Sequence, residues 1–205
     1  MNIIDISMPI HENMQVFNNN ISNRPKITNF SNGNIYESEI KMNLHTGTHI
    51  DFPLHMIPGG ETSDSLDISK FITDCFVLDF SDVDDKITDV HLKGKKIEPD
   101  SFILLKTKNS LIDTFDMNFV FVDAKGAAYL KEQRIKGVGI DSLGIERSQA
   151  GFDTHKTLMQ NGIAILEGLR LGNVAEGKYK MIALPLHINN VEALPARVIL
   201  TDIDS

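Results

Sequence analysis

The chain of 205 residues has no tryptophan, a single cysteine, and no apolar run near the roughly 20 residues that span a bilayer. The single cysteine, Cys75, excludes an internal disulfide, and its setting in Cys75-Phe-Val-Leu-Asp-Phe80 is typical of a buried strand. Basic residues are fewer than acidic ones, 20 against 28, and the net charge is −8. A surface of that sign disfavours nucleic acid as a partner.

The first residues lack the basic stretch and apolar core of a secretion signal, and Asp5 falls among them. We therefore expect a cytoplasmic protein without a membrane partner. Apolar residues make up 41% of the chain and charged residues 23%, as in ordinary soluble proteins. No repeat, low-complexity tract or linker divides the sequence, so residues 1–205 are expected to form one domain.

Histidine is concentrated in one short segment. Three of the seven histidines fall within the eleven residues His45-Thr-Gly-Thr-His49-Ile-Asp51-Phe-Pro-Leu-His55, where the chain's average density would place fewer than one. Imidazole and carboxylate are the usual protein ligands of zinc and similar divalent ions. The segment predicts a metal site. The alternatives are a histidine-rich surface loop or histidines hydrogen-bonded within a core.

The backbone of this segment favours a bent, extended chain. A helix could pair His45 with His49, but Gly47 and Pro53 disfavour one. In a straight strand those two histidines would lie about 13 Å apart. Two bonds of about 2.0–2.1 Å to one ion cannot cover that distance. We therefore expect the chain to curl at Gly47, whereas His49 and Asp51, about 6.6 Å apart, need no bend to share an ion.

Hydrophobic patterns predict a mixed domain rich in strands. Strands are expected over 2–7, 35–43, 75–80, 102–106, 119–122, 137–141, 163–166, 180–186 and 197–201, and an irregular segment over 13–24. Helices are expected over 67–74, from the N-cap Asp123 to Arg134, and over 153–160 with Asp153 or Thr154 as cap.

Two acidic residues at the ends of expected strands need an explanation. Glu167 continues the apolar run Ile163-Ala-Ile-Leu, where a carboxylate is costly unless it is paired or bound to a metal. The alternative is that Glu167 lies just past the buried part, in solvent. Asp141 either lies near the site or caps the turn that follows it.

The segment from His45 to His55 matches the HxGTHxDxPxH signature of the cyclase family of metal-dependent hydrolases at every fixed position. Bacterial arylformamidases (kynurenine formamidases) and isatin hydrolases belong to that family. The resemblance extends over most of the chain, including 1–9, 137–142, 183–187 and 193–197. It implies an α/β fold, mixed and β-rich: a swivelling β/β/α domain with a barrel-like central sheet. It also implies a homodimer or higher homo-oligomer.

The resemblance further implies two zinc ions per chain. Histidine and carboxylate ligands would also suit manganese or iron. In the family, two histidines bind the first ion, an aspartate and a glutamate bridge, and a third histidine, twelve residues before that glutamate, binds the second ion. Carried over by position, this ligand set is His45, His49, Asp51, His155 and Glu167.

The implied reaction is the opening of a small amide, N-formyl amide or lactam by metal-activated water. His55 would carry the proton, although the sequence would equally allow it to be a ligand. The segment Met14-Gln-Val-Phe17-Asn-Asn-Asn20 lacks the family's Pro-Gly, and arylformamidases place a substrate-contacting tryptophan there. Phe17 is the candidate replacement, so the substrate among such amides stays open. The alternatives are a lyase or ring-closing reaction on the same scaffold and a non-catalytic metal-binding protein.

Overall fold

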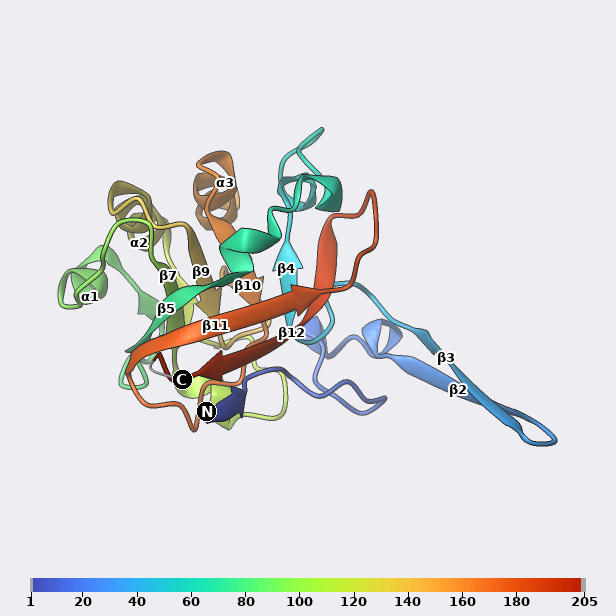
Figure 1. Cartoon of the computed structure of the whole chain (residues 1–205). Coiled ribbons are helices and arrows are strands. Elements are labelled where there is room, and N and C mark those ends of the chain that lie inside the picture. Colours follow the sequence, from blue (N-terminus) through green and yellow to red (C-terminus); the bar gives the residue numbers. More distant parts are fainter. Residues whose placement is uncertain (1, 204–205) are drawn as a thin grey trace.

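The computed structural model describes residues 2–203, in which a closed, barrel-like sheet carries its α-helices on one side (Figure 1). The strands of the main sheet are β1 (Ile3–Asp5), β4 (His49–Asp51), β5 (Ile72–Asp79), β7 (Phe102–Lys106), β9 (Gly137–Ile140), β10 (Ala164–Glu167), β11 (Gly177–Pro185) and β12 (Ala193–Thr201). The helices are α1 (Asp89–Lys93), α2 (Ala124–Glu132) and α3 (Asp153–Gln160).

The strand order is β1-β12-β11-β5-β7-β9-β10-β4, and β4 also pairs with β12, which closes seven of the strands into a barrel. The central pairs β5–β7, β7–β9 and β9–β10 are parallel, whereas β4 runs antiparallel to both of its neighbours. A small parallel pair joins β6 (Lys86–Ile87) to β8 (Phe121–Val122). This is the mixed, β-rich, barrel-like fold that the sequence predicts.

Strand alternation divides the apolar side chains between two cores. In β7, Phe102 and Leu104 belong to the cluster that fills the barrel, while Ile103 and Leu105 belong to the cluster beneath the helices. Successive side chains of a strand point to opposite faces, so a strand buried on both faces reads as an unbroken apolar run. Because β7 is such a strand, its bounds could be predicted from the sequence.

A hairpin formed by β2 (Lys26–Asn32) and β3 (Ile35–Lys41) projects away from the barrel (Figure 1). Its apolar side chains are largely exposed, among them Phe30, Tyr36 and Ile40. Among the described residues, no helix is long and apolar enough to cross a membrane.

One expected helix differs in the structure, and one hairpin strand was not expected. The helix expected over 67–74 is a 3-10 turn, η5 (Ile68–Phe71), followed directly by β5, because Ile72–Asp74 pair with β11. β2 was not expected at all, since its polar sequence has no buried face to impose alternation. Asp123 does cap α2, accepting a hydrogen bond from the Gly126 amide. Tertiary pairing thus overrides local propensity at these two points.

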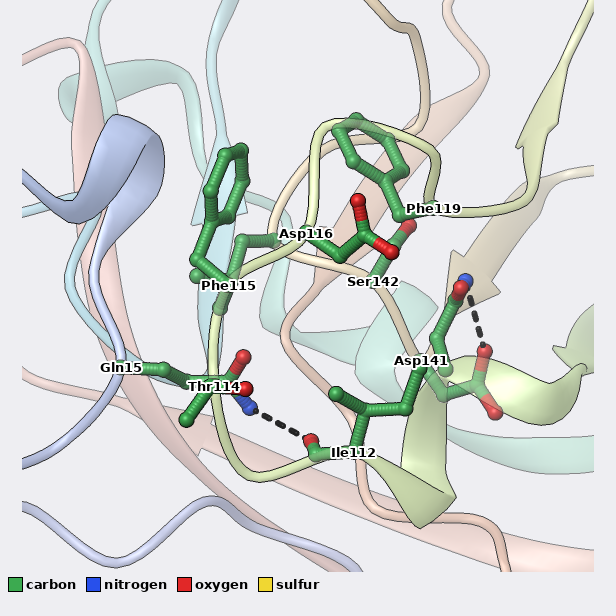
Figure 2. A pocket seen from close by; sticks show the side chains of 10 residues that line it. Gln15, Ile112, Thr114, Phe115, Asp116, Phe119, Asp141 and Ser142 are labelled. Carbon is green, nitrogen blue, oxygen red and sulfur yellow. Dashed lines mark hydrogen bonds between the residues drawn. The ribbon is translucent and has the colours of Figure 1, made fainter.

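Asp141, at the end of β9, holds together the loop that follows β7. Its carboxylate accepts hydrogen bonds from the amide and hydroxyl of Thr107 and from the hydroxyl of Ser110. Figure 2 shows Asp141 on the wall of a small pocket. Asn109 also lines this pocket, and its amide nitrogen lies 3.5 Å from Oδ1 of Asp141. Burial, opposed by these hydrogen bonds, raises the pKa of Asp141 to about 6. Asp141 thus braces the turn at Thr107–Ser110, and not the turn after β9 that the sequence led us to expect.

We predict that Asp141→Asn lowers the free energy of unfolding by about 1–3 kcal/mol, because an amide NH₂ would face donors where a carboxylate oxygen now accepts. Urea unfolding at neutral pH measures the change. Asp82→Asn, at an exposed position, is the control and should stay within about 0.5 kcal/mol of wild type. Equal stability of the two variants would contradict the role assigned to Asp141.

Candidate metal centre

The strand β4 places His49 and Asp51 on the outer face of the barrel. Between them, Ile50 points into the barrel core, so its two neighbours face the opposite way, toward α3. β4 is paired with β10 in the register that sets His49 opposite Glu167 and Asp51 opposite Ile165. The register brings a histidine and a carboxylate from distant parts of the chain onto one surface.

Two glycines allow the chain to reach this register. Gly47 has a φ of 72°, and the bend that it makes lies between His45 and His49, as the sequence predicts. Gly168, with a φ of 69°, ends β10 so close to this bend that a Cβ atom would collide with the carbonyl oxygen of Gly47. The hydroxyl of Thr48 donates to the carbonyl of Gly168 at 2.6 Å and fixes the contact.

Three further histidines complete the centre. His155 comes from α3, where Thr154, His155 and Leu158 form part of the buried face. His45 precedes the bend, and the short 3-10 turn η3 (Pro53–His55) carries His55 back beside it. The ring centroids of His55 lie 4.1 Å from His45 and 5.8 Å from His155.

The histidine nitrogens converge on two carboxylates. Oδ1 of Asp51 lies 3.1 Å from Nδ1 of His45 and 3.4 Å from Nε2 of His49, while Oδ2 lies 3.8 Å from Nε2 of His155. Oε2 of Glu167 lies 3.4 Å from Nε2 of His49, and Oε1 lies 3.3 Å from Nε2 of His155. Each carboxylate therefore turns one oxygen toward His49 and the other toward His155.

These separations suit ligands of common ions better than hydrogen bonds. Two atoms bound tetrahedrally to one zinc at about 2.0–2.1 Å are about 3.3 Å apart, whereas a good N–H···O bond is about 2.9 Å. Among the described residues, Nε2 of His49 and both oxygens of Asp51 are buried without a hydrogen-bond partner. Buried polar atoms left unpaired are costly, so the donor set fits a bound cation.

Two groups of potential ligand atoms share Asp51. The atoms of His45, Asp51 and His55 lie within 4.8 Å of one another, and so do those of His49, Asp51 and Glu167. Within the described residues, the structure thus brings together the six predicted metal and catalytic positions. His55 joins the first group, so its geometry is compatible with either of the two roles that the sequence left open.

The ring nitrogens that face away from Asp51 are also satisfied. Nδ1 of His49 is 2.9 Å from the carbonyl oxygen of Gly47, and Nδ1 of His155 is 2.9 Å from Oε2 of Glu146. Nε2 of His45 lies 3.4 Å from Oε1 of Glu192. Such outer acceptors fix the tautomer of a ligating histidine. Neither glutamate was expected, because an isolated acidic residue outside a motif gives no sequence signal.

Phe17 lies beside the centre rather than in it. Its ring packs against Phe115 and Phe119, with centroids 5.0 and 6.4 Å away. The same cluster borders Gly144, the neighbour of Ile145, whose amide donates to Oε1 of Glu167 at 2.6 Å. Figure 2 shows Phe115 and Phe119 on the wall of the pocket near Ser142. An aromatic wall thus adjoins the loop that supports the centre.

Comparison with known proteins agrees with this geometry. Residues 4–147 match the model of the family described as "Putative cyclase". The chain belongs to the Cyclase family. It is also 30% identical over 211 residues to the kynurenine formamidase of Bacillus cereus (strain ATCC 10987 / NRS 248), covering 98% of this chain and 97% of that one. The comparison confirms the predicted family and supports the predicted class, a hydrolase of C–N bonds outside peptides.

Solved structures of Cyclase-like proteins share the fold. A potential metal-dependent hydrolase with cyclase activity is 45% identical, with a TM-score of 0.93 over 97% of this chain and 96% of that one. Isatin hydrolase A from Labrenzia aggregata, bound to benzyl benzoate, has a TM-score of 0.84 at 24% identity over 98% and 93% of the two chains, which shows the fold alone. The similarity to the potential metal-dependent hydrolase, together with the clustered ligand atoms of this chain, supports a divalent metal at the centre.

Charge pairing at the centre predicts a pH dependence for protein stripped of metal. Burial would lower the pKa of His49, but Asp51 and Glu167 outweigh burial and raise it to about 10. Burial would also lower the pKa of His155, but Glu146 and Glu167 outweigh burial and raise it to about 10. A raised histidine pKa stabilises the fold fully below about pH 6.5 and stops doing so as the pH rises toward 10.

We therefore predict that the Tm of chelator-stripped protein falls steadily between pH 7 and 9.5. Zinc-loaded protein should show a smaller fall, because bound metal requires neutral imidazole already. Calorimetry of the two forms in matched buffers measures the difference. Parallel Tm curves for both forms would contradict the pairing described above.

Proposed function

We propose that this chain is a metal-dependent hydrolase that opens a small amide, N-formyl amide or lactam. The observation that carries the proposal is the pair of buried carboxylates, Asp51 and Glu167, each presenting one oxygen to His49 and the other to His155. Carboxylates that divide their oxygens in this way are suited to bridging two ions. The whole-length similarity to kynurenine formamidases supports the same class.

The proposed ligand set is the one that the family resemblance implies, and the distances are compatible with it. His45 and His49 would hold a first ion with Oδ1 of Asp51, and His155 would hold a second with Oδ2. Glu167 would bridge from the opposite side. We propose two zinc ions per chain, with manganese as the alternative, since nitrogen and oxygen donors suit both. Bound at these residues, the metal would acidify water and polarise the substrate carbonyl.

His55 is the proposed proton carrier. Burial, joined by the charges of His45 and His155 and opposed by Asp51, lowers the pKa of His55 below its ordinary value. Its imidazole is therefore neutral near pH 7, and a ring nitrogen can accept the proton of the attacking water. The same imidazole can then donate that proton to the departing amine nitrogen of the substrate.

The aromatic wall beside the centre is the proposed substrate contact. Phe17, Phe115 and Phe119 pack tilted or edge to face against one another, and the ring of a substrate could add to this cluster in the same way. An aryl formamide or an aromatic lactam would place its ring there and its carbonyl toward Asp51. A lyase or ring-closing reaction on the same residues is the second candidate, and no feature of the centre favours it over hydrolysis.

The hairpin β2–β3 supports a homo-oligomer. A two-stranded hairpin is marginally stable alone in water, and this one exposes Phe30, Ile35, Tyr36 and Ile40. We propose that a second copy covers part of it in a homodimer. We also propose a cytoplasmic location, which the single cysteine supports, because Cys75 cannot form a disulfide within the chain.

We predict that protein purified without chelator contains about two equivalents of metal per chain, and that Glu167→Gln retains less metal. The rate at which Glu167→Gln hydrolyses a panel of aryl formamides, lactams and lactones should be at least about 100-fold below that of wild type. The metal lowers the activation free energy by several kcal/mol, and each 1.36 kcal/mol changes the rate tenfold. Glu176→Gln, a surface change, is the control. A product that forms by elimination or ring closure would favour the lyase, and full activity of Glu167→Gln would refute the bridge.

His55→Ala separates the two roles of that histidine. If His55 carries the proton, the variant keeps the wild-type metal content and loses about 10²- to 10⁴-fold in kcat. The pH–rate profile should also lose its acidic limb. Elemental analysis beside steady-state kinetics measures both quantities. Loss of one equivalent of metal would instead make His55 a ligand.

A further inference from the structure

Glu146 is a buried carboxylate that the proposed reaction does not use. The residue is 5% exposed and lies in the loop after β9, nine residues before His155. One oxygen accepts a hydrogen bond from the amide of Thr154 at 3.2 Å. The other accepts from the amide of His155 at 3.1 Å and lies 2.9 Å from its Nδ1. Three donors of α3 are thus directed at one side chain.

The bonds to the backbone alone would make Glu146 a helix cap. α3 begins after Phe152, which offers no side-chain cap, and Thr154 donates its hydroxyl to the carbonyl of Val122 instead. The expected caps, Asp153 and Thr154, are therefore replaced by a carboxylate from another loop. A cap needs only the amides, however, and the contact with the imidazole is the additional feature.

The loop that contains Glu146 also holds the carboxylate of Glu167 in place. The preceding residue, Ile145, donates its amide to Oε1 of Glu167 at 2.6 Å, and that oxygen lies 3.3 Å from Nε2 of His155. Ile145 is itself anchored, because its carbonyl accepts from the amide of Val122 at 2.9 Å. Two consecutive residues thus hold the bridging glutamate and the histidine that faces it.

We propose that Glu146 is a positioning residue that holds the proton of His155 on Nδ1 and keeps Nε2 directed at Asp51 and Glu167. The inference rests on the proposed metal centre and assigns Glu146 an effect on the second ion only. A charged acceptor also makes Nε2 a better donor to a metal. Glu192 is a weaker counterpart on His45, because it lies 3.4 Å away and its side chain is 39% exposed.

The test uses zinc-loaded, full-length protein and compares Glu146→Gln with Asp123→Asn. Asp123 caps α2 through one oxygen, whereas Glu146 caps α3 through both, and Asp123 lies outside the proposed metal centre. A chromophoric chelator removes zinc in increasing amounts, which measures the affinity of each ion without an activity assay. We expect Glu146→Gln to weaken one of the two zinc ions by about 10- to 100-fold. Asp123→Asn should lower the Tm and leave both affinities unchanged.

Glu146→Asp separates capping from positioning and serves where the glutamine variant folds poorly. Aspartate keeps a negative charge at the start of α3 but is shorter by one methylene. It should therefore still stabilise the N-terminus of the helix, while its contact with Nδ1 of His155 is weakened. We expect a Tm near that of wild type and a weakened second ion. Wild-type affinity for both zinc ions in the two Glu146 variants would overturn the inference and leave Glu146 as a cap.

Nitrogen-15 NMR of the His155 ring provides a readout that does not depend on metal count. The wild-type Nδ1 proton should resonate far downfield, as expected for a bond to a carboxylate, and should move upfield in Glu146→Gln. If wild-type protein binds fewer than two ions, the two-ion proposal fails. The inference about Glu146 is then decided by this resonance, which supports it by moving and overturns it by staying in place.

Discussion

The burial of two carboxylates side by side is the constraint on which the rest of the structure depends. Asp51 and Glu167 are 6% and 3% exposed, and each is removed from water that would otherwise stabilise its charge. Burial and the charge of Asp51 both act to raise the pKa of Glu167, and the adjacent His155 and His49 outweigh them and lower it. Two buried anions need positive charge between them, and divalent ions supply more of it than protonated imidazoles.

The fold meets this constraint by separating structural tasks from chemical ones. Inward-facing residues of β4 and β10, such as Ile50 and Leu166, complete the barrel core, and their neighbours are thereby fixed on the opposite face. Because the side-chain period of a strand is two, the packing of the barrel dictates the direction of His49, Asp51 and Glu167. A shift of register by one residue would send all three into an apolar interior, so core packing and the metal centre stabilise the same register.

The part of the centre that could be predicted from the spacing of residues is the part whose side chains are close together in the sequence. His45, His49, Asp51 and His55 stand within eleven residues, and Gly47 bends between them as the chain's reach requires. Pairing that cluster with His155 and Glu167 needed the family resemblance, because nothing in a twelve-residue spacing says which strand will lie beside β4. Buried runs such as Phe102–Lys106 were predicted with correct bounds, since burial on both faces leaves an unbroken apolar signal.

Residues that act through others were beyond sequence reasoning for a physical reason. Glu146 resembles any solvated glutamate in a polar loop, and the role proposed for it depends on α3, which brings the amides of Thr154 and His155 and the His155 ring to it. The strand β2 was missed for the converse reason, since it pairs with β3 through the backbone while its side chains remain in solvent. Glu146 depends on a partner far along the chain, and β2 depends on backbone hydrogen bonds. The pattern of side chains in the sequence indicates neither kind of contact.

The division between scaffold and loops also bears on specificity. The proposed ligands lie on β4, on β10, on α3 and next to a tight bend, where packing limits their freedom. Phe17, Phe115 and Phe119 come instead from the N-terminal segment and the 112–120 loop, which are joined by the bonds of Gln15 to Ile112 and Asn19 to Phe115. Loops can change without disturbing a core. A fixed centre beside a variable aromatic wall is the arrangement expected where one hydrolytic chemistry serves different amides. A chain without tryptophan can therefore still bring its histidines and carboxylates together at the centre.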